Sequence, residues 1–172
     1  MTPTSRRVAI GLAASLALLS VCSATATAAG AVDVAGDVKN PTTLSVDALR
    51  GLPSQTQAVT FQSDKGAQSH TYVWVPLLDI VTAAAPAVDS KHASLSVVIV
   101  ATGADGYSAA VSLGEISPEF AATPVLVACT EDGQELDRPR LAVPGDIKGG
   151  RYVSDLTELR VVNLAHQAFG NV

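Results

Sequence analysis

The sequence predicts a sheet-dominated α+β fold in a single compact domain. Most of its apolar runs are brief, rich in β-branched residues and bounded by turn residues, which is typical of strands. A few short stretches between these runs carry the start signals of helices. About 140 residues remain once an N-terminal leader is set aside, enough for one hydrophobic core and too few for two.

Capping and turn residues define the elements of the first half. Ser45 can cap a short helix over residues 46–50, with Asp47 in the first turn, where the helix dipole favours an anion. Pro76 opens a second helix that runs to Ala83, because proline is tolerated in a first turn. The predicted strands of this half are 32–38 and a hairpin of 57–63 and 69–74, joined by 64–68 with Gly66 in the turn.

The second half predicts further strands. Residues 95–101 form a nearly continuous apolar run, which indicates a strand buried on both faces. Ser112 and Glu115 have the spacing of a capping box, so we expect a short helix there with Glu115 as cap partner. The remaining predicted elements are strands at 107–111, 125–130 and 156–164, a hairpin turn at Asp132-Gly133, and a loose tail at 165–172.

The N-terminus has the three regions of a cleavable signal peptide. Arg6 and Arg7 precede an apolar run over 8–21, and Ala26-Thr27-Ala28 supplies a small-residue cleavage site. We therefore assign residues 1–29 to the signal peptide and 30–164 to the folded domain, and expect a periplasmic or secreted protein. A membrane anchor is the rival interpretation, but the run is shorter than the roughly 20 apolar residues that a spanning helix needs. The arginine pair leaves the choice between general and twin-arginine export open.

Charge and cysteine content narrow the classes of partner. The net charge is −5 and the mature part has no Lys/Arg run, which argues against nucleic acid or an anionic membrane surface. A small molecule or a protein is the expected partner, with the oligomeric state open. Cys129 is the one cysteine outside the leader, so a disulfide within the chain is excluded, and we expect Cys129 to pack as a small hydrophobe.

A series of short segments occurs in an order that resembles a known family. The opening matches lie at 36–41, 44–45, 49 and 75–81, and Ala104-Asp105-Gly106-Tyr107, 125–128, Asp132-Gly133, 139–145 and Arg151-Tyr152-Val153 follow. Together they resemble the molybdopterin-binding domain of the sulfite oxidase family, from about residue 34 to residue 164. The resemblance implies that family's sheet-rich fold and a molybdenum–pterin cofactor.

The sequence departs from the family at the chemical centre. Ser63 takes the place of the cysteine whose thiolate binds molybdenum in the catalytic members, and residues 64–68 keep little of the cofactor loop. A hydroxyl is a hard, high-pKa group unlike a soft thiolate, so we assign no metal ligand and leave the catalytic residues unknown.

A pterin phosphate would need cationic and backbone donors. Arg140, Lys148 and Arg151 occur with glycines near the end of the chain, and such groups can cradle an anion. Arg151 is the leading candidate, and a solvated surface loop is the alternative. The candidate cofactor contacts are therefore Ser63, Arg140, Lys148, Gly149 and Arg151.

Other chemistry has little support in the sequence. His70, His92 and His166 are too scattered to predict a metal site, although His70 shares one strand face with Tyr72 and Trp74. Hydrolase and nucleotide-binding motifs are missing. Two functions remain: an exported molybdopterin-binding protein, acting as an oxidoreductase component, or a cofactor-free periplasmic or secreted binding or interaction module on the same fold.

Overall fold

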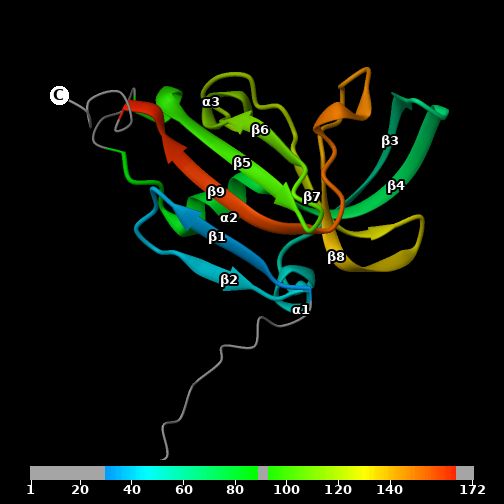
Figure 1. Cartoon of the computed structure of the whole chain (residues 1–172), viewed down its shortest axis with the longest axis horizontal. Coiled ribbons are helices and arrows are strands. Elements are labelled where there is room, and N and C mark those ends of the chain that lie inside the picture. The colour runs from blue at the N-terminus through cyan, green and yellow to red at the C-terminus, as the bar shows by residue number, and fades with distance from the viewer. Residues whose placement is uncertain (1–29, 89–92, 166–172) are drawn as a thin grey trace, which may run out of the picture.

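The computed structural model describes residues 30–88 and 93–165, so the predicted signal peptide, His92, His166 and most of the predicted tail lie outside the described residues. The described part folds into two sheets with short helices between the strands (Figure 1). None of its helices is long and apolar enough to cross a membrane.

The first sheet joins the two ends of the domain. Its first and last strands, β1 and β9, pair in parallel, and every other pair in the sheet is antiparallel. In spatial order the five strands are β2 (Thr42–Leu44), β1 (Val32–Gly36), β9 (Leu156–Asn163), β5 (Val97–Gly103) and β6 (Ser108–Ser112).

The second sheet is fully antiparallel and carries a long hairpin. In spatial order its strands are β3 (Gln55–Ser63), β4 (Gly66–Pro76), β7 (Leu126–Glu131) and β8 (Gln134–Ala142). Ser63 pairs with Gly66, so Asp64 and Lys65 alone form the turn, and both strands are longer than predicted. The β3–β4 hairpin extends away from the body of the domain (Figure 1).

The helices begin where the local signals indicate. Ser45 caps α1 (Val46–Arg50) by accepting a hydrogen bond from the Ala48 N–H. The helix α2 (Leu77–Ala84) follows Pro76 and buries its apolar face in the core. The other helical elements are α3 (Leu113–Ile116) and two 3-10 turns, η1 (Ala93–Ser96) and η2 (Gly149–Arg151).

The hydrophobic core lies mainly between the first sheet, α2 and the inner face of the second sheet. It includes residues of β1, α2, β5, β7 and β9, and Cys129 is buried within it as expected. Burial raises the pKa of the Cys129 thiol, which keeps that thiol protonated. A smaller cluster on the second sheet contains Tyr72 and Trp74.

The strand predicted at 95–101 is corrected in two respects. Leu95 is exposed and belongs to η1, and β5 then alternates between buried and half-buried residues. Both neighbours of β5 are antiparallel, and antiparallel sheets commonly cover one face only. A continuous apolar run therefore led to the wrong prediction of burial on both faces.

The parallel pairing of β1 with β9 offers a test of the fold. Gly36 has a φ of +95°, and a Cβ added there would collide with the backbone carbonyl of Val161. Gly66 has a φ of +99° with open space around it, so it is a matched control for backbone strain alone. Left-handed backbone costs a non-glycine residue about 1–3 kcal/mol. We expect Gly36→Ala to lower the free energy of unfolding by about 2 kcal/mol more than Gly66→Ala does, in urea denaturation. Equal losses would contradict the close approach of the two strands.

Candidate functional site

A cavity of about 410 Å³ lies between the tip of the β3–β4 hairpin and the segment around η2. The two walls are far apart in sequence and are joined by a hydrogen bond from the Gln62 N–H to the Ile147 carbonyl, 2.8 Å long. Three of the predicted cofactor contacts, Ser63, Lys148 and Gly149, therefore meet at one site. The residues that line this hairpin-tip cavity are Phe61, Gln62, Ser63, Asp64, Lys148, Gly149 and Gly150.

The Ser63 hydroxyl is part of the hairpin turn. Its Oγ donates to the carbonyl of Gly66 and accepts from the Lys65 N–H, each at 3.1 Å. These are the local hydrogen bonds by which serine stabilises turns. The residue that the family resemblance compares with a metal-binding cysteine thus stabilises the turn between β3 and β4.

Gly149 is required by packing against an aromatic ring. A Cβ at this position would lie 2.6 Å from the Phe61 ring. That ring in turn contacts Tyr152, with ring centroids 4.3 Å apart. A larger residue at position 149 would therefore displace the wall of the hairpin-tip cavity.

Lys148 is the cation of the hairpin-tip cavity. It is exposed, and it forms no ion pair with any of the described residues. The exposed carboxylate of Asp64 lines the same cavity. The cavity thus presents one group of each charge beside the Gln62 side chain, and it suits a small polar ligand.

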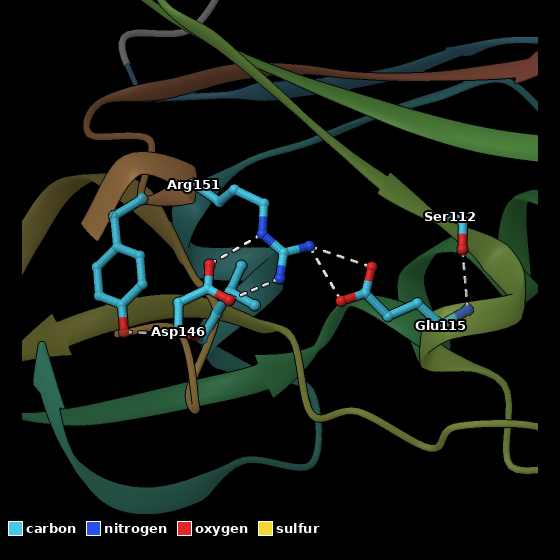
Figure 2. Close-up of polar contacts among 6 residues, drawn as sticks. Ser112, Glu115, Asp146 and Arg151 are labelled. Atoms are coloured by element: carbon cyan, nitrogen blue, oxygen red, sulfur yellow. Dashed lines mark hydrogen bonds and ion pairs between the residues drawn. The ribbon is translucent and has the colours of Figure 1, made fainter. Parts of the chain in front are cut away.

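Arg151 lies apart from that cavity and is held by two carboxylates (Figure 2). Its Nε and Nη2 donate to the two oxygens of Asp146, at 2.8 and 2.7 Å. Its Nη1 donates to both oxygens of Glu115, at 3.0 and 3.1 Å. The hydrogen bonds that Arg151 donates to Asp146, and then those to Glu115, raise the pKa of Arg151 far above its ordinary value. The guanidinium is therefore committed to partners within the chain.

The same contacts correct the expected role of Glu115. Ser112 does cap α3, since its Oγ accepts from the Glu115 N–H at 3.0 Å. The Glu115 carboxylate, however, turns toward Arg151 (Figure 2). A charge-assisted pair with a guanidinium is stronger than a hydrogen bond to a neutral N–H, which explains the departure from a full capping box.

Arg140 is also paired and lies away from the hairpin-tip cavity. It projects from β8, and its Nη1 contacts both oxygens of the Glu131 carboxylate at 3.2 Å. Glu131 in turn lies 3.1 Å from Nδ1 of His70, which also lies 2.8 Å from Asp132. No sequence pattern predicts this contact, because the histidine and the two acids come from different hairpins.

The residues present do not fit the molybdenum–pterin cofactor that the resemblance implies. The Ser63 oxygen is occupied by the turn, and Cys129 lies in the core and outside the cavity lining. The guanidinium groups of Arg140 and Arg151 face carboxylates. Lys148 alone remains to meet a phosphate, with Asp64 beside it. A cofactor role for the five candidate residues stays a prediction, and the geometry does not favour it.

The Arg151 contacts predict a clear effect on stability. In Arg151→Gln, Asp146 and Glu115 are left largely buried without a cation, so the free energy of unfolding should fall by about 1–3 kcal/mol, less than for a fully buried pair. Arg160→Gln, which breaks an exposed pair with Glu158, is the matched control and should cost at most about 1 kcal/mol. Adding Asp146→Asn to Arg151→Gln should restore part of the loss. Equal costs for the two arginines in urea denaturation would show that the first network is not structural.

The comparisons with known proteins bear on the fold. No protein-family model matches the sequence, and a search of curated proteins gives no significant match. Among solved structures, the chain is similar to the sulfane dehydrogenase SoxCD from Paracoccus pantotrophus, with a TM-score of 0.63 and 18% identity. The likeness covers 78% of this chain and only 38% of the SoxCD chain. SoxCD is a sulfite oxidase-family molybdoenzyme, so the likeness confirms the sheet-dominated fold of that type that the sequence predicts.

Proposed function

We propose that this chain is an exported binding module that uses the sulfite oxidase-type fold without molybdopterin. One observation carries the proposal: three of the five candidate cofactor contacts, Ser63, Arg140 and Arg151, are already bonded within the chain. Arg151 is shared by Asp146 and Glu115, Arg140 is paired with Glu131, and the Ser63 oxygen closes its turn. The periplasm or the cell exterior is the proposed location, on the strength of the predicted signal peptide.

Energetics argue against recruiting these groups on binding. If Arg151 rotated toward a phosphate, Asp146 and Glu115 would lose their shared cation while each carboxylate is still about three-quarters buried. Losing one partner of a largely buried ion pair costs about 1–3 kcal/mol here, because an uncompensated charge is left behind. A pterin phosphate would have to supply that energy before it gained any affinity.

The hairpin-tip cavity is the proposed binding site. Lys148 and Asp64 provide opposite charges at its rim, Gln62 provides an amide, and the Phe61 ring provides an apolar wall. Such a lining matches a small polar molecule that bears an anionic group, which Lys148 would anchor. A protein that inserts a side chain of the same chemistry is the second class of partner.

The proposal is tested by cofactor content. Mature protein is purified from a host that makes molybdopterin and exports the chain, and it is analysed for molybdenum, tungsten and, after denaturation, pterin fluorescence. We expect well under 0.1 equivalent of each, or roughly the background of such assays, in folded and monodisperse protein, because the donor groups are committed.

The variant Ser63→Cys makes the test sharper. It restores the thiol of the family pattern and leaves Arg140 and Arg151 with their carboxylates, so we expect it to remain free of metal and pterin. Near-stoichiometric cofactor in the wild type would overturn the proposal and favour the oxidoreductase component instead. Uptake by Ser63→Cys alone would show that only the ligand, and not the surrounding donors, had been lost.

A further inference from the structure

Three metal-ligating side chains converge on one face of the second sheet. Nδ1 of His70, a carboxylate oxygen of Glu131 and one of Asp132 all lie within 4.8 Å of one another. Nδ1 is 2.8 Å from the Asp132 oxygen and 3.1 Å from the Glu131 oxygen. Donor atoms about 3 Å apart suit a single ion with bonds of about 2.0–2.2 Å. We call these three residues the His70 cluster.

The backbone fixes the His70 cluster in place. Thr71 and Asp132 are joined twice, since the Thr71 N–H donates to the Asp132 carboxylate and the Asp132 N–H donates to the Thr71 carbonyl, each at 2.8 Å. Tyr72 lies directly opposite Glu131 in the pairing of β4 with β7. The strand with the histidine and the turn with the acids therefore keep a set distance without help from an ion.

Electrostatics and exposure both permit a cation to enter. The His70 cluster places two carboxylates beside one imidazole, so its charge favours a cation. The side chains of His70 and Glu131 are 23% and 16% exposed, and that of Asp132 is 53% exposed. One side of the His70 cluster is thus open to solvent and the other is buried.

A buried hydroxyl beside the cluster is incompletely satisfied. Tyr72 is fully buried, and its hydroxyl makes no hydrogen bond of normal geometry with the described residues, although the Arg140 side chain lies beside it. It lies on the same strand face as His70, because alternate residues of a strand point the same way, and the two rings are 6.0 Å apart. Buried polar groups are nearly always satisfied, so an orphan of this kind indicates an unseen water or ion. Water bound to a cation at the His70 cluster would supply such a partner.

We propose that His70, Glu131 and Asp132 form a binding site for one divalent transition-metal ion, of which Zn²⁺ is the first to test. One imidazole and two carboxylates are ligands that Zn²⁺ accepts, and three protein ligands leave room for water. The ion takes the place of the proton on Nδ1, while Nε2 carries the remaining ring proton. The site shares no residue with the lining of the hairpin-tip cavity, and the proposal does not require that cavity to bind a ligand.

Arg140 sets the strength of this site. Its guanidinium contacts both oxygens of Glu131, so it competes with the metal ion for that carboxylate. Its positive charge also repels the metal ion. Removing its charge with Arg140→Gln should therefore tighten Zn²⁺ binding. A group of acids that merely attracted cations to the surface would show the same direction, so the histidine provides the deciding variant.

The test is isothermal titration of mature protein with Zn²⁺ in a weakly chelating buffer. We expect one saturable site, weakened about ten-fold or more by His70→Gln and by Asp132→Asn, as for loss of a ligand or its support. Glu135→Gln is the matched control, because Glu135 is an exposed acid on the β7–β8 hairpin that lies outside the His70 cluster. The affinity of this variant for Zn²⁺ should equal that of the wild type.

A second measurement needs no variant. In ¹⁵N NMR spectra of the imidazole groups, the chemical shift of His70 Nδ1 should change on addition of one equivalent of Zn²⁺. Absence of saturable Zn²⁺ binding by the wild type would overturn the proposal. So would unchanged affinity in a folded His70→Gln protein, together with no shift of the His70 Nδ1 signal in the wild type. The His70 cluster would then be an ion-paired contact between two hairpins. Loss of the site with cofactor content unchanged would leave the proposed function untouched.

Discussion

The pairing of Arg151 with Asp146 and Glu115 is the interaction on which the candidate site depends. The η2 turn has only three residues and no side-chain cap, so local structure alone cannot fix it. Arg151 ties this turn to α3, which follows β6 at the edge of the first sheet (Figure 2). Lys148, Gly149 and Gly150 immediately precede Arg151, and so the position of one wall of the hairpin-tip cavity follows from this network.

The residues that stabilise the fold are largely distinct from those that line the candidate site. The main core lies between the first sheet, α2 and the second sheet, and none of its fully buried residues lines the hairpin-tip cavity. Stability therefore comes from apolar packing and from ion pairs within the chain. Carboxylates placed opposite Arg140 and Arg151 supply the counter-charge that a bound anion would otherwise provide.

Local signals were predictable from the sequence, and distant pairings were not. Ser45 and Pro76 locate two helices because a cap and a first-turn proline act within a few residues. The Glu115–Arg151 pair spans 36 positions and the His70–Asp132 contact spans 62, and no short pattern encodes either. The meeting of Ser63 with Lys148 and Gly149 was anticipated only through the family resemblance, because β3 and the η2 turn are joined by a single bridge. The half-buried face of β5 was not predicted, because an apolar run does not reveal which neighbours a strand will have in its sheet.

Phe61 connects the two regions where chemistry is proposed. The Phe61 ring lines the hairpin-tip cavity and packs beside Gly149. Its centroid also lies 6.1 Å from that of the His70 ring. Its closest ring contact, Tyr152, donates its hydroxyl to the Val143 carbonyl and so anchors this aromatic row to the segment after β8. A change in the orientation of His70 would thus reach the cavity through packed rings rather than through the backbone. Packed side chains transmit such displacements because they leave little free volume, and the Phe61 ring lies so close to Gly149 that a Cβ there would be 2.6 Å from it.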